Sequence, residues 1–370
     1  MKLLHVVGAR PNYMKVASVM RAVARDRRFQ QVLVHTGQHY DAAMNDVFFA
    51  DLGLPAPDHY LGVGSGSQAE QTAKVMLGFE QVLMKERPER VVVVGDVNST
   101  VAATLVAVKE GVPVDHVEAG LRSFDRTMPE EINRIVTDSL SSMLFTHSPE
   151  AREHLLREGR PGDGIHYVGN VMVDALDLHL AKARTRRALA DEGLTPRAYA
   201  VLTLHRPSNV DDRATLQKLL EILGDVTREL PVIFPVHPRT QARLQAAHDD
   251  GLKIPERLVL TAPKGYLDFL QLLDSAKLVL TDSGGIQEET TALGVPCLTL
   301  RENTERPITC QLGSNVLVGR NREQVRAELE RVLDGRFSVG QRPPLWDGRA
   351  AERIVGVWAR FLDQPLGAVA

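Results

Sequence analysis

The sequence predicts an α/β protein made of two doubly wound, Rossmann-like domains. Short apolar runs rich in β-branched residues alternate with amphipathic helical stretches, which is typical of parallel strands connected by crossover helices. This alternation ends near residue 170, and a second series begins near residue 199. Polar clusters directly follow several strands, and ligands of such sheets bind at the carboxyl ends of the strands. We therefore expect two domains that face each other across a ligand-binding cleft.

The composition is that of a globular, enzyme-like chain long enough for two domains. Its 370 residues are 44% hydrophobic and 25% charged, and the net charge of -3 argues against a general nucleic-acid or membrane-surface binder. No apolar run approaches the roughly 20 residues that span a bilayer, and the opening run is too short for a secretory signal. Cys297 and Cys310 lack metal-type spacing, so we expect a cytoplasmic protein without disulfides.

The first predicted domain covers residues 1–172, and the C-terminal helix at residues 347–370 is expected to pack back onto it. Its strands are predicted at residues 3–7, 31–35, 90–94, 113–117 and 143–146. Its helices are predicted at residues 11–25, 68–85, 99–109, 130–141 and 150–157. A charged helical segment at residues 178–197 is expected to bridge the domains. The second domain, residues 173–346, has predicted strands at residues 199–204, 231–236, 258–261, 278–280, 296–300 and 315–318.

The clearest local signal for a ligand site is the stretch TDSGGIQEE, in which an apolar strand runs into a glycine turn and a helix start. Gly284 and Gly285 let the backbone approach a ligand closely, and Ser283 stands near the N-cap of the helix. A helix N-terminus presents unpaired N–H groups that suit a phosphate or diphosphate. Glu288 and Glu289, one turn further, suit ribose hydroxyls. The alternative is a turn whose glycines only serve packing.

Polar clusters also follow the first strands of the chain. Arg10 follows the first strand, with Lys15 one turn into the next helix, and an arginine here is a natural bidentate phosphate ligand or simply an exposed loop residue. Asp96 follows the run VVVV and is either a catalytic acid or base or a helix-capping group.

Two further carboxylates belong to the same predicted sheet edge. Glu118 follows the next strand, and Glu130 and Arg134, four residues apart, share one face of the following helix. A plain surface ion pair is the usual meaning of that spacing. Three carboxylates from successive strand ends of one domain nevertheless favour chemistry.

The second domain adds further polar residues at strand ends. His205 follows its first strand and is expected to face the glycine turn as a phosphate contact, while Arg306 lies beyond the strand that follows the turn. His35 and His39 are four residues apart but straddle a strand end and a glycine, so a zinc site is not expected. No metal is assigned.

Taken together, nine motifs in order resemble the non-hydrolysing UDP-N-acetylglucosamine 2-epimerases, over about residues 1–334. They read GARPNYMK, GDVNS, HVEAGLRS, PEEINR, LTLHR, PVHP, TDSGGIQEE, GVPCLTLRENTERP and GSNVLVG. The resemblance implies a glycosyltransferase-B-like fold, no metal or nicotinamide cofactor, usually a homodimer, and interconversion of UDP-N-acetylglucosamine and UDP-N-acetylmannosamine.

The resemblance also implies roles for individual residues. The family's catalytic positions match Asp96, Glu118, Glu130, Arg134 and His205. Its UDP-binding positions match Arg10, Ser283, Gly284, Gly285, Glu289 and Arg306, with Phe269 in place of the aromatic that packs on uracil and Lys15 at a basic position of the first motif. Elimination of UDP from C1 would make the C2 proton labile and give a 2-acetamidoglucal intermediate. Which carboxylate is base and which is acid stays open.

Two stretches depart from the family pattern. The segment HRPSN lacks the Arg-Glu that many members carry before the asparagine, and QHYD replaces a glutamine-rich variant of members regulated by their substrate. These departures leave the catalytic assignment intact and put allosteric regulation in doubt. Competing interpretations are a UDP-sugar glycosyltransferase of the same fold, a hydrolysing 2-epimerase that releases N-acetylmannosamine and UDP, and a non-catalytic UDP-sugar sensor.

Overall fold

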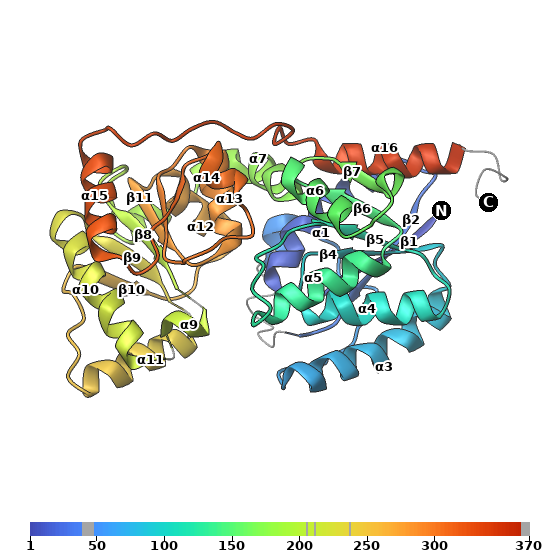
Figure 1. The fold of residues 1–370 in the computed structure, drawn as a ribbon, viewed down its shortest axis with the longest axis horizontal. Coiled ribbons are helices and arrows are strands. Elements are labelled where there is room, and N and C mark those ends of the chain that lie inside the picture. Colours follow the sequence, from blue (N-terminus) through green and yellow to red (C-terminus); the bar gives the residue numbers. More distant parts are fainter. Residues whose placement is uncertain (39–47, 205, 211, 237, 364–370) are drawn as a thin grey trace. The chain divides into compact units, whose positions relative to one another are not determined.

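The computed structural model describes residues 1–38, 48–204, 206–210, 212–236 and 238–363, and it divides into two compact units (Figure 1). The first unit comprises Met1–Leu178 and Pro344–Ala370, and the second comprises His179–Pro343. The boundary between them falls within helix α7 (Val171–Arg184), and the boundary expected from the sequence, at residues 172 and 173, lies in the same helix. Each unit is an α/β sandwich, so the predicted fold class is confirmed.

The sheet of the first unit is parallel throughout the described residues, in the order β3-β2-β1-β4-β5-β6-β7. Its strands are β1 (Lys2–Val7), β2 (Gln30–His35), β3 (His59–Tyr60), β4 (Arg90–Val94), β5 (Val114–Val117), β6 (Met143–Thr146) and β7 (Ile165–Tyr167). Its other helices are α1 (Arg10–Val23), α3 (Gln68–Glu86), α4 (Asn98–Lys109), α5 (Pro129–Leu140), α6 (Pro149–Arg157), a 3-10 turn η1 (Gly162–Gly164) and α16 (Ala350–Asp363).

Both faces of this sheet are covered because the strands are apolar on both sides. Val92 and Val94 of β4 pack with α1 and α16, while Val91 and Val93 pack with α3 and α4. Helix α16 therefore completes the core of the first unit although it follows the whole second unit in sequence (Figure 1). Local capping contributes as well, since the Ser67 hydroxyl accepts from the Glu70 amide at the start of α3 (3.2 Å).

The second unit has the same construction around a parallel sheet in the order β10-β9-β8-β11-β12-β13. Its described strands are β8 (Ala200–Thr203), β9 (Val232–Pro235), β10 (Leu258–Thr261), β11 (Leu278–Thr281), β12 (Cys297–Thr299) and β13 (Asn315–Leu317). Its described helices are α8 (Ala188–Asp191), α9 (Pro207–Val210), α10 (Arg213–Glu229), α11 (Pro238–Asp249), α12 (Tyr266–Asp274), α13 (Gly284–Leu293), α14 (Ile308–Gln311) and α15 (Arg322–Leu333). Helices α10 and α15 cover one face, and α12 and α13 cover the other.

One predicted element is wrong. The single helix expected at residues 178–197 does not form, because α7 ends at Arg184 and a separate short helix, α8, follows. Its charged residues are used in separate contacts instead: Arg184 and Arg186 pair with Asp274 and Asp268 of α12, at 2.8 and 2.6 Å. The short strands β3 and β7 have no counterpart among the predicted strands, since two or three residues carry no readable period.

Candidate active site

Both sheets reverse their strand order at one point, and several of the predicted site residues follow the strands that meet there. In the first unit the order reverses between β1 and β4, and in the second unit between β8 and β11. Ligands of doubly wound sheets bind at such switch points, outside the carboxyl ends of the strands. The loops that begin at Gly8 and Gly95 leave the first switch point, and the loop that begins at Asp282 leaves the second.

Glu118 and Lys15 form a buried ion pair at the first switch point. Their side chains are 4% and 7% exposed, and Lys15 Nζ bonds to Glu118 Oε2. The Glu118 backbone has a φ of 72°, a left-handed conformation that few non-glycine residues adopt. A Cβ added at Gly95 would lie 3.0 Å from Lys15 Nζ, so the glycine allows the β4 loop to pass beside the pair.

Asp96 is held by Arg134 from helix α5. The Arg134 guanidinium is 2% exposed and bonds to Asp96 Oδ2, while its other edge bonds to Glu131 Oε2 at 2.7 Å. Asp96 itself is 24% exposed, so this carboxylate is both anchored and accessible. The structure thus brings the predicted residues Asp96 and Arg134 together.

Glu131 belongs to this cluster, and the sequence interpretation did not single it out. It is 1% exposed and accepts hydrogen bonds from the amides of Ser123 and Phe124, both at 2.9 Å. Burial alone would raise the pKa of Glu131, but these bonds and the Arg134 charge outweigh it and lower the pKa. Glu130, the predicted residue, is exposed on the first turn of α5. The spacing of Glu130 and Arg134 could not reveal which of two adjacent glutamates faces inward.

Several amide side chains hold the loops of the first switch point in place. Asn12 donates to Val94 O at 2.9 Å, and Asn133 donates to Asp96 O at 2.9 Å. Gln38 accepts from the Ser99 hydroxyl at 2.8 Å, which ties the β2 loop to the start of α4. The backbone around Asp96 is therefore fixed from three elements.

The second switch point carries the glycine turn. Ser283 is the N-cap residue of α13, and its amide donates to the Thr281 hydroxyl at 2.9 Å. A Cβ added at Gly284 would lie 2.3 Å from Arg306 Nη1, so this position has no room for a side chain while Arg306 packs there. Gly285 follows as the next helical residue, and α13 ends at Leu293, with Gly294 as its C-cap in the left-handed conformation.

Arg306 supports the turn from beneath and is 5% exposed. Its Nε lies 2.8 Å from Glu288 Oε1 and its Nη1 lies 2.6 Å from Glu305 Oε1. Burial opposes ionisation of Glu305, but the charges of Arg306 and Arg301 outweigh it and lower its pKa. Burial, with the adjacent Glu288, instead raises the pKa of Glu289 to about 8. The neighbouring residues Glu288 and Glu289 therefore differ in their surroundings. Glu288 is paired with Arg306, whereas Glu289 is buried beside Glu288.

Other predicted residues are only partly described. Phe269 lies half-buried on α12 against the core beneath α13. Arg10 begins α1, but its side chain lies outside the described residues. His205, His39 and the rest of the QHYD segment after Gln38 also lie outside them.

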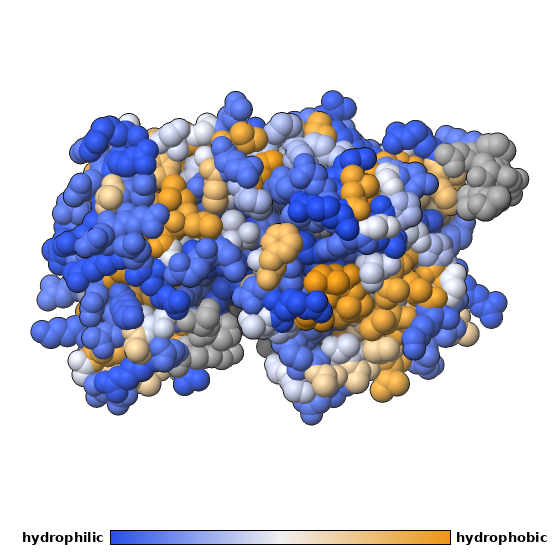
Figure 2. Space-filling model, viewed as in Figure 1, coloured by the Kyte–Doolittle hydropathy of each residue, from blue (hydrophilic) through white to orange (hydrophobic). Residues whose placement is uncertain are grey.

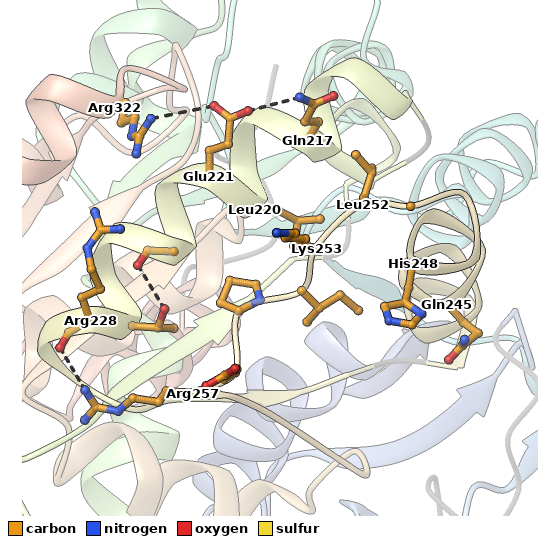
Figure 3. A pocket seen from close by; sticks show the side chains of 16 residues that line it. Gln217, Leu220, Glu221, Arg228, Gln245, His248, Leu252, Lys253, Arg257 and Arg322 are labelled. Atoms are coloured by element: carbon orange, nitrogen blue, oxygen red, sulfur yellow. Dashed lines mark hydrogen bonds and ion pairs between the residues drawn. The ribbon is translucent and has the colours of Figure 1, made fainter.

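A separate cavity of about 1150 Å³ in the second unit is lined by α10, α11 and the segment before β10, and the residues that line it do not include the glycine turn (Figure 3). Its lining includes Arg228, Arg257 and Arg322, and Arg257 precedes β10, so the cavity is at the amino ends of the strands. Arg257 donates to Arg228 O at 2.9 Å, and Arg322 pairs with Asp225. Within the described residues, no group of three or more His, Cys, Asp or Glu side chains is arranged to hold a metal ion. No described helix is long and apolar enough to cross a membrane.

The fold and the two switch points define a two-unit α/β protein of the glycosyltransferase-B-like class. A family model described as UDP-N-acetylglucosamine 2-epimerase matches residues 21–359. A UDP-N-acetylglucosamine 2-epimerase of Methanocaldococcus jannaschii is 43% identical over 363 residues, which cover 96% of this chain and 98% of that protein. A UDP-2,3-diacetamido-2,3-dideoxy-D-glucuronate 2-epimerase of Pseudomonas aeruginosa is 39% identical, over 98% of this chain and 100% of that protein.

A solved structure agrees with these relationships. The M. jannaschii UDP-GlcNAc 2-epimerase in complex with UDP-GlcNAc and UDP superimposes with a TM-score of 0.90 at 42% identity, over 97% of this chain and 100% of that chain. The chain belongs to the UDP-N-acetylglucosamine 2-epimerase family, as its motifs predicted.

Proposed function

We propose that this protein is a non-hydrolysing UDP-N-acetylglucosamine 2-epimerase, which interconverts UDP-N-acetylglucosamine and UDP-N-acetylmannosamine. The observation that carries the proposal is the pairing of Asp96 with Arg134 and of Glu118 with Lys15 at one switch point. A glycine turn that opens a helix, at the other switch point, supplies a diphosphate site. The relatives named above support the substrate class.

The second unit is proposed to bind the UDP moiety. Unpaired amides at the start of α13, from Gly284 and Gly285 after Ser283, would hold the diphosphate together with the helix dipole. Glu289 would take ribose hydroxyls, and Phe269 would pack on uracil. Arg306 would act from beneath the turn, and Arg10 and His205 would complete the diphosphate contacts.

The first unit is proposed to supply the acid–base groups. One carboxylate removes the C2 proton while the C1–O bond breaks and UDP leaves, which gives a 2-acetamidoglucal. A second carboxylate then protonates C2 on the other face while UDP adds back to C1. Asp96, Glu118 and Glu130 are the candidates. Arg134 orients Asp96, and Lys15 orients Glu118.

Incubation with UDP-N-acetylglucosamine alone in D2O, followed by NMR, tests this function. Intact UDP-N-acetylmannosamine with deuterium at C2 of both epimers is expected, because a proton lost by elimination returns from solvent. Free N-acetylmannosamine with UDP would instead identify a hydrolysing enzyme. Retention of the original C2 proton in an epimerised product would exclude the elimination route.

A second substrate is suggested by the P. aeruginosa relative, whose name specifies a C3 acetamido group and a uronate. The same assay with UDP-2,3-diacetamido-2,3-dideoxy-D-glucuronate compares the two sugars directly. A higher kcat/KM for UDP-N-acetylglucosamine is expected. The opposite order would reassign the substrate while the proposed chemistry at C2 stayed the same.

The active form is proposed to be a homodimer. Figure 2 shows apolar surface over the α3 to α5 side of the first unit, where Leu77 and Met84 of α3 are 69% and 54% exposed and Ile132 of α5 is 37% exposed. Exposed apolar patches of this kind mark interaction surfaces. Light scattering should give a dimer mass that Leu77→Glu reduces. A monomeric unmutated protein would contradict the proposal.

A further inference from the structure

A fully buried histidine on β5 connects two of the loops of the first switch point. His116 has no solvent exposure, and its two ring nitrogens bond in opposite directions. Nε2 lies 2.7 Å from the carbonyl oxygen of Gly95, the residue before Asp96. Nδ1 lies 2.6 Å from Oδ1 of Asp138 on helix α5.

The two partners of His116 fix the orientation of its ring. A carbonyl oxygen only accepts, so Nε2 must carry a proton that it donates to Gly95. Burial alone would raise the pKa of Asp138, but the charges and hydrogen bonds of His116 and Arg122 outweigh it and lower the pKa. Asp138 Oδ1 holds the opposite ring nitrogen, Nδ1, so the His116 ring is fixed in one orientation from both sides.

Asp138 also bonds to the loop that follows β5. Its Oδ2 accepts from the Gly120 amide at 3.1 Å and from Arg122 Nη1 at 2.7 Å. Both donors belong to the segment that follows Glu118. Asp138 and His116 therefore connect the loop after β4 with the loop after β5, and both side chains are fully buried.

Helix α5 also contacts Asp96 directly. Arg134 lies one turn before Asp138 on α5 and bonds to the Asp96 carboxylate, while Asp138 acts through His116 on the Gly95 carbonyl. Helix α5 therefore fixes both the side chain of Asp96 and the backbone carbonyl of Gly95. Catalytic geometry depends on such support, since small misplacements of an acid–base group cost large factors in rate.

We propose that His116 and Asp138 are positioning residues that hold the Gly95–Asp96 turn in its reactive orientation. This proposal rests on the proposed epimerase function, in which Asp96 acts at C2 of the sugar. Neither residue touches the substrate. Their loss should therefore lower kcat and leave KM and UDP affinity nearly unchanged.

Two substitutions of His116 separate its two hydrogen bonds. Glutamine places its amide near the position of Nε2 and can still donate to Gly95 O, whereas asparagine places its amide near Nδ1 and keeps only the bond to Asp138. His116→Asn should lower kcat by at least about 10-fold, and His116→Gln by a smaller factor because it loses only the bond to Asp138, with KM within about twofold in both. Steady-state epimerisation and calorimetric UDP binding measure these quantities.

The matched control is His5→Gln. His5 is equally buried on β1 of the same sheet, and its ring interacts with Gln31 of the neighbouring strand β2 instead of with the loop that carries Asp96. This variant should change thermal stability without changing kcat. If the His116 substitutions acted only by disturbing the packing of the sheet, kcat would fall in His5→Gln as well as in the His116 variants, in proportion to their loss of stability.

The outcomes separate this proposal from the proposed function. An inactive unmutated protein would overturn both. An active unmutated protein with equal kcat in His116→Asn, or a change in KM alone, would overturn only the positioning role. If His116→Asn does not fold, as judged by circular dichroism, Asp138→Asn decides, because it keeps the shape of the side chain but removes the charge that orients His116. Unchanged kcat in Asp138→Asn would then overturn the proposal.

Discussion

At the residue scale, Asp96 is the side chain from which most of the proposed chemistry follows. Asp96→Asn keeps the size of the side chain and removes its charge, so turnover should fall by at least about 100-fold, the low end of what positioned acid–base groups contribute. UDP affinity should stay nearly unchanged, because Asp96 is not among the proposed UDP contacts. Steady-state kinetics and calorimetry measure the two effects. Loss of UDP binding would make Asp96 a scaffold residue instead.

The raised pKa of Glu289 should make the stability of the folded protein depend on pH. Its pKa in the folded protein, about 8, lies above the ordinary value of 4.5, so the folded state keeps a proton that the unfolded chain releases. The contribution of Glu289 to the free energy of unfolding is fully present below about pH 4.5 and is lost as the pH rises through about 8. Glu289→Gln is neutral in both states and should gain stability relative to the unmutated protein across that window.

Thermal unfolding of both proteins between about pH 5 and pH 9 tests the prediction. The exposed Glu330 of α15 offers a control, since Glu330→Gln should leave the pH dependence as it is. Parallel curves for Glu289→Gln and the unmutated protein would show that Glu289 is ionised in the folded state.

At the scale of elements, the start of α13 requires a glycine because Arg306 packs against it. Gly284→Ala brings a Cβ to within 2.3 Å of Arg306 Nη1 and 2.8 Å of Glu305 Oε1. Overpacking of this kind costs about 1–3 kcal/mol, and UDP affinity should fall by more than about 10-fold as the turn shifts. Urea unfolding and calorimetry measure the two effects.

Gly224 of α10 is the matched control, with the opposite expected sign. A Cβ added there has only Pro255 Cγ nearby, at 4.0 Å, and alanine is favoured over glycine within a helix by about 0.5–1 kcal/mol. Gly224→Ala should therefore stabilise the protein slightly without changing UDP affinity. Equal UDP affinity in the two variants would contradict the proposed diphosphate site.

At the scale of the whole molecule, the chain returns to complete the first unit after the second has ended. Trp358 of α16 is fully buried in the first core, and its Nε1 donates to Asp115 Oδ2 at 2.8 Å. Trp358→Ala should cost about 3–5 kcal/mol in the first unit, through the cavity and the lost hydrogen bond. Hydrogen exchange should show lost protection in the strands of the first sheet.

The control for this prediction lies three residues further along the same helix. Phe361 is 41% exposed, so Phe361→Ala should change stability by less than about 1 kcal/mol. UDP binding by the second unit should survive Trp358→Ala. A loss of protection confined to the second unit would contradict the assignment of α16 to the first core.

The sequence by itself determined the elements that depend on local pattern. The apolar runs gave strands such as β4 at Arg90–Val94 and β10 at Leu258–Thr261 with their observed bounds, because buried parallel strands are apolar on both faces. The glycine turn before α13 was likewise legible, because Gly284 and Gly285 follow a strand and precede a helix. Motif spacing also sufficed to predict the family.

Only the tertiary structure decided which neighbouring side chains face inward. Glu130 and Glu131 are adjacent and chemically alike, and burial of Glu131 depends on the amides of Ser123 and Phe124, which another loop brings to it. The break in the helix expected at residues 178–197 was not readable either, and Arg184 and Arg186 beside it pair with α12, which is distant in sequence. His116 offered no local signal either, because its role arises from Gly95 and Asp138, which are distant in sequence and adjacent only in the folded sheet.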